Sequence, residues 1–78
     1  MEKDLILHND NVHSFDYVRG CLIRFCNHAP LQAEQCIILA HNNGKCHIKR
    51  GDVLEMIQMQ QVLQNYKLTV SLEDLCYQ

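Results

Sequence analysis

The sequence predicts one small α+β domain in which a three-stranded antiparallel sheet packs against three helices, in the chain order β-α-α-β-α-β. Three observations favour this class. The chain has only 78 residues, its apolar residues recur at helical spacing in three segments, and they alternate with polar residues in the strand segments. A chain of this length buries only about 60–65% of its unfolded surface, which is enough for one core. The helices and the sheet must therefore share that core.

The N-terminal half is predicted to contain a short strand and two helices. The apolar run at residues 5–8 lies between a charged start and a polar stretch, which is typical of a strand followed by a turn. Ser14 can cap a helix whose apolar positions recur every three or four residues as far as Asn27. Pro30 suits the first turn of a second helix, which the Asn-Asn-Gly sequence at 42–44 ends. Because this second helix is the most apolar, we expect it to be sandwiched in the domain.

The C-terminal half is predicted to contribute a strand, a helix and a closing strand. Residues 45–49 alternate between polar and apolar side chains, as a half-buried strand does. The Arg-Gly pair at 50–51 is expected to turn the chain, and Asp52 can cap a third helix over residues 53–65. Residues 68–73 alternate clearly and form the closing strand.

Charge and composition exclude several classes of partner. Lys and Arg number 7 and Asp and Glu number 9, which gives a formal net charge of −2. A nearly neutral chain does not bind nucleic acid or an anionic membrane by bulk charge. The longest apolar runs, such as residues 36–40, are far shorter than the roughly 20 residues of a membrane span. The five cysteines, an odd number in a chain whose start does not look like a signal peptide, indicate reduced thiols in the cytoplasm.

Histidines and cysteines are numerous, but their spacing indicates neither a metal site nor a catalytic nucleophile. No Cys-x-x-Cys pair occurs. Cys21, Cys26 and Cys36 fall on predicted apolar helix faces, where cysteine behaves as a small hydrophobic residue. Ser14 and Ser71 are expected to be a helix cap and a strand residue. The sequence therefore predicts no metal, no cofactor and no enzymatic activity.

Two polar features lie beside apolar segments. Asn9 and Asp10 follow the first strand, either as an Asx-rich turn or as hydrogen-bond acceptors at the end of that strand. His41 follows the most apolar part of the second helix. Its imidazole can interact with the helix dipole, or it can be a neutral acceptor at the rim of an apolar pocket. The residues alone leave both pairs of interpretations open.

These features resemble the ClpS family. The similarity is carried by LHNDN at residues 7–11, by FDYV at 15–18, and by the pattern A-x-x-x-I-x-x-A-H-x-x-G-K from Ala33 to Lys45. It runs from about residue 5 to Lys45 and resumes in the closing strand. ClpS is a small bacterial adaptor that binds proteins by destabilising N-terminal residues and hands them to the Clp unfoldase–protease.

The resemblance implies an adaptor domain at residues 5–75 after a short lead-in at 1–4. The partners would be proteins or peptides with a bulky hydrophobic N-terminal residue (an N-degron) and a Clp AAA+ unfoldase of the ClpA or ClpC type. The residues that would bind the free α-amine of the substrate are Asn9, Asp10 and His41. Those that would line the pocket for the N-terminal side chain are His13, Phe15, Val18, Ile37, Ala40 and Leu68.

An alternative function is a ClpS-like scaffold that docks on an unfoldase or another partner without reading N-termini.

The sequence also departs from the family's common pattern at the pocket. His13 and Phe15 stand where the family commonly has Thr and Met, and Asn11 stands where a second acidic residue is common. The segment between Lys49 and Leu68 is shorter than in better-known members, which predicts a short third helix.

Overall fold

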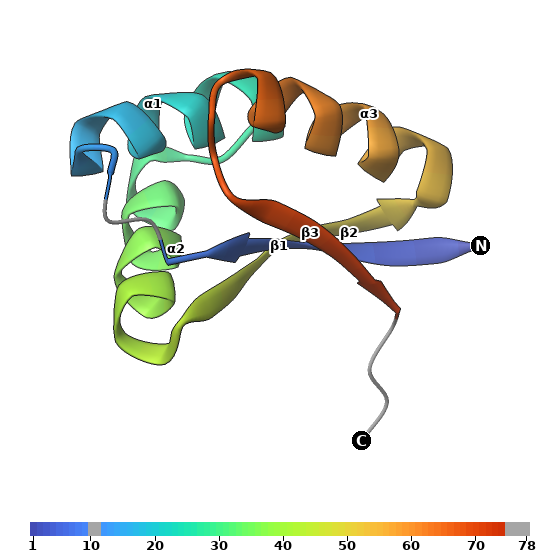
Figure 1. Ribbon diagram of the computed structural model, residues 1–78, viewed down its shortest axis with the longest axis horizontal. Helices are drawn as coiled ribbons and strands as arrows, with labels where there is room; N and C mark the ends of the chain where they lie inside the picture. The colour runs from blue at the N-terminus through green and yellow to red at the C-terminus, as the bar shows by residue number, and fades with distance from the viewer. Residues whose placement is uncertain (10–11, 75–78) are drawn as a thin grey trace.

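A computed structural model of the chain describes residues 1–9 and 12–74 and contains the six elements in the predicted order (Figure 1). They are β1 (Glu2–His8), α1 (Phe15–Cys26), α2 (Pro30–Asn43), β2 (Lys45–Asp52), α3 (Val53–Asn65) and β3 (Val70–Asp74). The predicted fold class is therefore confirmed. None of the helices within the described ranges has the length and apolar character needed to span a membrane.

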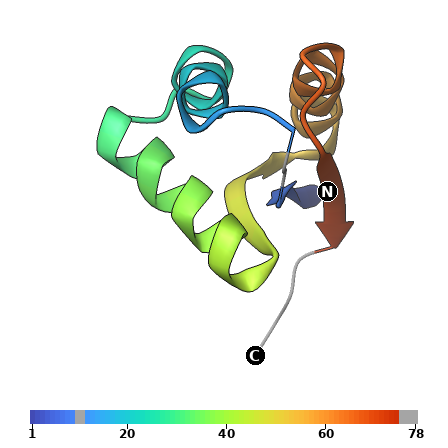
Figure 2. The ribbon, with the colours of Figure 1, turned by 60° about the vertical axis from the view of Figure 1, so that its left-hand side comes forward.

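The sheet has the strand order β2-β1-β3, and β1 is antiparallel to both neighbours. Leu5 and Leu7 of β1 belong to the core that the sheet shares with the helices. Figure 2 shows α2 on one side of this core and α1 and α3 above it. A strand at the edge of an antiparallel sheet alternates between core and solvent side chains, which explains the alternation in β2. The middle strand β1 does not alternate, since residues 4–7 are all buried.

The first strand is longer than the sequence predicted. Glu2, Lys3 and Asp4 belong to β1, so the expected lead-in at 1–4 is wrong for these three residues. Lys3 pairs with Gly51 of β2 and with Asp74 of β3, which places a charged segment in the middle strand. The expected domain end at residue 75 lies outside the described residues.

The turn expected at Arg50 and Gly51 is also wrong, because both residues continue β2 to its end. Gly51 is explained by packing. A Cβ atom at this position would lie 3.0 Å from the Cε atom of Met56, whose side chain is fully buried. A glycine allows α3 to fold back closely over the end of the strand.

The second helix is less buried than expected. It buries Ala33, Cys36 and Ala40 along one face, whereas the side chains of Ile38 and Leu39 are 50% and 47% exposed. The expectation of a sandwiched helix is therefore wrong. The reason is that α2 packs against β2 and α1 on that one face and leaves the rest of its apolar surface uncovered.

The predicted helix caps are confirmed. The Ser14 hydroxyl accepts a hydrogen bond from the Tyr17 N–H at 3.1 Å, and the Asp52 carboxylate accepts one from the Leu54 N–H at 3.1 Å. Gly44 ends α2 with a φ of 90°, a left-handed conformation that glycine adopts without a steric penalty.

A charged cluster explains how the middle strand accommodates Asp4, which is only 6% exposed. The Arg50 Nε donates to Asp4 Oδ1 at 2.8 Å, and the Nε2 atom of His47 lies 3.0 Å from the same oxygen. The hydrogen bond from Arg50 outweighs the effect of burial and, with the contribution of His47, holds the pKa of the Asp4 carboxyl below its usual value.

We expect Asp4→Asn to lower the free energy of unfolding by about 1–2 kcal/mol at neutral pH, since it removes the negative charge of the carboxylate with which Arg50 and His47 interact. The folded-state pKa of Asp4 lies below the unfolded value, so this stabilisation is complete above about pH 4 and is lost as the pH falls through the folded-state pKa. Urea unfolding of both proteins should give curves that converge in acid. A difference that stays constant in acid would contradict this role for Asp4.

Candidate functional site

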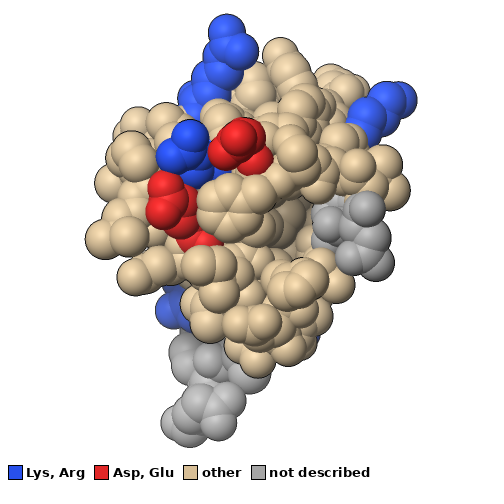
Figure 3. All heavy atoms as spheres, turned by 90° about the vertical axis from the view of Figure 1, so that its left-hand side faces the viewer, with Lys and Arg blue, Asp and Glu red and all other residues tan. Residues whose placement is uncertain are grey.

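A pocket of about 320 Å³ lies where the end of β1, the start of α1 and the middle of α2 meet. Figure 3 shows this face of the molecule, on which most of the described side chains are uncharged. The described residues that line it are Leu7, His8, Asn9, His13, Ser14, Phe15, Val18, Ile37, Ile38, Ala40 and His41. None of these carries a carboxylate, an ammonium or a guanidinium group. The volume is typical of the smaller ligand pockets, which span about 300–1,000 Å³.

Backbone hydrogen bonds bring Asn9 and His41 to the same pocket. The Asn9 N–H donates to the Gly44 carbonyl at 2.9 Å, and the preceding His8 N–H donates to the Thr69 carbonyl at 2.9 Å. The end of β1 is thus tied to the end of α2 on one side and to the lead into β3 on the other. Because Gly44 follows His41 by three residues, this tie sets Asn9 beside the last turn of α2.

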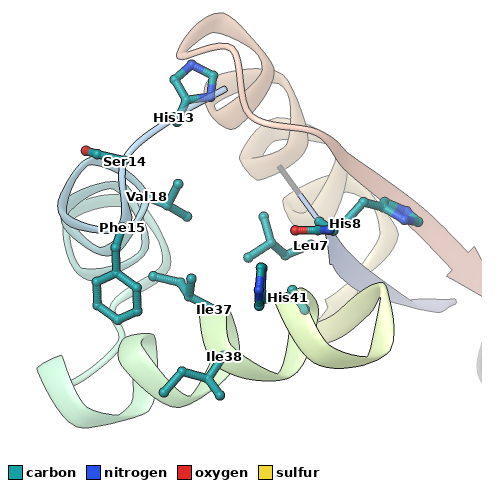
Figure 4. A pocket seen from close by; sticks show the side chains of 11 residues that line it. Leu7, His8, His13, Ser14, Phe15, Val18, Ile37, Ile38 and His41 are labelled. Atoms are coloured by element: carbon teal, nitrogen blue, oxygen red, sulfur yellow. The ribbon is translucent and has the colours of Figure 1, made fainter. Parts of the chain in front are cut away.

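The inner walls of the pocket are apolar and largely buried. Leu7, Val18 and Ala40 are almost inaccessible to solvent, and Ile37 is half-buried. Ile37 and Ala40 lie three residues apart on α2 and therefore share a face with His41 at its edge. Figure 4 shows Val18 and Leu7 extending from opposite sides into the space between α1 and α2.

Some of the polar side chains around the pocket have hydrogen-bond or stacking partners within the domain, and others have none among the described residues. The Nε2 atom of His8 lies 2.7 Å from Ser71 Oγ, and in Figure 4 its ring points away from the pocket. Ser14 caps α1, and the His13 ring stacks on Tyr17 with 4.8 Å between centroids. Within residues 1–9 and 12–74, no hydrogen bond engages the His41 ring. This ring lies in the middle of the labelled lining side chains (Figure 4).

The structure places most of the predicted site residues together. Those at the pocket are Asn9, His13, Phe15, Val18, Ile37, Ala40 and His41. Asp10 lies outside the described residues. Leu68 was also expected in the pocket wall. It is buried, its N–H donates to the Leu63 carbonyl at 3.1 Å, and it is not among the described lining residues. What each lining residue binds stays a prediction.

Four lining residues were not predicted from the sequence. Leu7 and His8 directly precede Asn9, and Ser14 directly precedes Phe15, so adjacency was the available signal. Ile38 lies three residues before His41 and hence beside it on the helix surface. It was missed because the family resemblance did not assign it, and because the second helix was expected to be buried.

The cysteines nearest the core are poor nucleophiles. Burial raises the pKa of Cys26 to about 11, and it also raises the pKa values of Cys21 and Cys36. Such thiols stay protonated at neutral pH, whereas the thiolate is the reactive form. In the part of the chain that the structure describes, no group of three His, Cys, Asp or Glu residues is arranged to hold a metal ion.

By fold, the chain is a small α+β domain with a three-stranded sheet, three helices and a pocket at one end of the sheet. A family model described as the ATP-dependent Clp protease adaptor protein ClpS matches residues 2–71, so the chain belongs to the ClpS family. This confirms the resemblance found in the sequence. Membership of an adaptor family also fits the prediction that the chain is not an enzyme.

Solved structures share the fold. The Agrobacterium tumefaciens protein ClpS2, solved with bound L-phenylalaninamide, aligns with a TM-score of 0.79 and covers 92% of this chain and 94% of that chain. The sequence identity is 13%, so this likeness concerns the fold. A comparison with curated proteins found no match.

We expect Gly44→Ala to lower the free energy of unfolding by about 1 kcal/mol, since alanine disfavours the positive φ of this cap. No atom lies within 4 Å of a Cβ added at Gly44, so the cost is conformational rather than steric. Urea unfolding gives the change in stability. An increase in stability would contradict the assignment of the cap.

Gly20→Ala is the matched control. Gly20 lies in α1, on the surface, and a Cβ added there also meets no atom within 4 Å. In a helix interior alanine is more favourable than glycine, so this variant should be more stable than the wild type by about 0.5–1 kcal/mol. The two substitutions are therefore expected to act with opposite signs.

Proposed function

We propose that this protein is an adaptor that binds proteins or peptides with a bulky hydrophobic N-terminal residue and delivers them to a Clp AAA+ unfoldase–protease. One observation carries the proposal: the same pocket presents hydrogen-bond acceptors and, beside them, buried apolar walls. A free N-terminal residue has the matching pair of features, an α-ammonium group next to a side chain. Membership of the ClpS family supports the same function.

The α-ammonium group needs acceptors and little competing positive charge. Asn9 offers its amide oxygen and His41, when neutral, offers a ring nitrogen, and both line the pocket. None of the other described lining residues is a lysine or arginine. Asp10 follows Asn9 directly in the sequence, and its carboxylate is proposed to supply the countercharge.

The hydrophobic side chain needs a dry cavity with fixed walls. Val18 of α1 and Ala40 of α2 are buried residues of the core that also line the pocket, so the packing of the domain holds both in place. Ala40 is small, which leaves volume between the helix and β1. An apolar side chain that enters this space exchanges water for apolar contacts, which is the main source of its binding energy.

The adaptor role includes a partner that accepts the bound substrate. We propose a cytoplasmic Clp unfoldase of the ClpA or ClpC type. A scaffold that docks on an unfoldase without reading N-termini is the competing function. The two differ in one property, because only the adaptor requires a free amine on the peptide.

We expect a peptide that begins with Phe or Leu to bind at least tenfold more tightly than the same peptide with an acetylated N-terminus. Acetylation removes the charge and two of the donors, and each hydrogen bond to a charged group contributes about 1.5–3 kcal/mol. His41→Ala should weaken binding of the free peptide about tenfold by removing one acceptor. Fluorescence anisotropy with C-terminally labelled peptides measures both effects.

Asn42→Ala is the matched control, since Asn42 is exposed on the same turn of α2 but does not line the pocket. It should bind the free peptide with wild-type affinity. Equal affinity of the wild type for free and acetylated peptides would rule out the amine site. It would favour the scaffold function instead.

We expect Ala40→Leu to fill the pocket and abolish binding of Phe- and Leu-initiated peptides. Overpacking typically costs about 1–3 kcal/mol of stability, so urea unfolding must accompany the binding measurement. Ala33→Leu is a matched control, since Ala33 is buried on the same face of α2 but outside the pocket. Ala40→Val provides a milder variant with a smaller loss of binding. Normal binding by a folded Ala40→Leu protein would place the side-chain site elsewhere.

A further inference from the structure

Two of the pocket-lining residues are large, apolar and exposed. Phe15 is 43% exposed and Ile38 is 50% exposed, whereas the inner walls are buried. Phe15 is the first residue of α1, and Ile38 lies in the middle of α2. In Figure 4 both lie beyond Ile37, on the side of the pocket away from His8. This apolar rim, Phe15 and Ile38, is therefore distinct from the end of the pocket where β1 stops.

We infer that the apolar rim is a subsite for the second residue of a bound peptide and that Ile38 is a specificity-determining residue within it. The subsite rests on the proposed function, because it requires the first residue to occupy the pocket. It selects peptides with an apolar second side chain over peptides with a polar or charged one. The subsite thus recognises the side chain of the second residue and not the N-terminal residue itself.

Distances along the two chains support this placement. The α-amine of the first residue is bound near His41, and Ile38 lies three residues before His41 on the same helix. Side chains at this spacing have Cβ atoms about 5–6 Å apart. The second Cα atom of a peptide is about 3.8 Å from the first. The second side chain is therefore within reach of Ile38 while the amine is bound.

The directions of the bonds at the first residue support it as well. The amine and the side chain point in different directions from the first Cα atom, the amine toward Asn9 and the side chain toward Val18. The remaining bond, to the carbonyl carbon, must then lead out of the pocket. The apolar rim lies on the side of the pocket away from His8. The carbonyl group of the first residue and the whole second residue can leave the pocket on that side.

The chemistry of the rim determines what it accepts. No charged side chain is among the described lining residues, so a charged second residue would lose hydration without gaining a partner. An apolar second residue covers Ile38 and the Phe15 ring, which removes exposed apolar surface from water.

The test uses four peptides and two variants. Two peptides start with Phe-Leu and Phe-Ser and are otherwise identical, and the other two are their acetylated forms. Ile38→Ser is compared with Leu39→Ser, because Leu39 is adjacent, is 47% exposed and does not line the pocket. Thermal unfolding of the two variants establishes that they are comparably folded.

We expect the wild type to bind the Phe-Leu peptide about three- to tenfold more tightly than the Phe-Ser peptide. This is the gain in affinity expected when one or two methylene groups of the leucine side chain are buried against the rim. Ile38→Ser should reduce this ratio to near one, and it should weaken binding of the Phe-Leu peptide more than binding of the Phe-Ser peptide. Leu39→Ser should keep the wild-type ratio.

Three outcomes would overturn the subsite, and they are distinguishable. A wild-type ratio near one shows that the second residue is not read. A ratio that persists in Ile38→Ser shows that another surface reads it. Equal binding of free and acetylated peptides removes the proposed function, and the subsite with it.

Discussion

The hydrogen bond from the Asn9 N–H to the Gly44 carbonyl is the contact on which the candidate site depends. It joins the end of the middle strand to the end of α2, two segments that are far apart in the sequence. The Gly44 carbonyl is available because α2 ends here in a left-handed residue and the chain turns into β2. This hydrogen bond continues the β1–β2 pairing, in which His8 lies opposite Lys45, and it sets Asn9 beside the last turn of α2, which carries His41.

The uneven burial of α2 follows from the same arrangement. One face, with Ala33 and Cys36, packs on β2 and α1, so the helix is fixed along its length. Near its C-terminal end, the small side chain of Ala40 leaves volume against β1 that a larger residue would fill. Ile37 and Ile38 then remain as wall and rim. The pocket is thus a consequence of a helix that is apolar on more of its surface than its neighbours can cover.

The sequence predicted the element order, the caps at Ser14 and Asp52, and most of the pocket residues, because each left a local pattern or a family motif. It failed where a long-range contact overrides the local pattern. Asp4 appears too polar for a central strand until Arg50 is placed beside it. The exposure of Ile38 depends on which helices cover α2.

The mouth of the pocket is the part of the site where this chain departs from the common family pattern, and packing fixes that departure. His13 stacks on Tyr17, and the Tyr17 hydroxyl donates to the Tyr66 carbonyl at 2.6 Å, which ties the start of α1 to the end of α3. Phe15 follows the Ser14 cap directly, so its backbone is held by the first turn of the helix. An aromatic ring has only two side-chain torsions, fewer than the methionine common at this position. If the pocket binds an N-terminal side chain as proposed, an entrance with fewer torsions would select that side chain by its shape more than by adjustment of the rim.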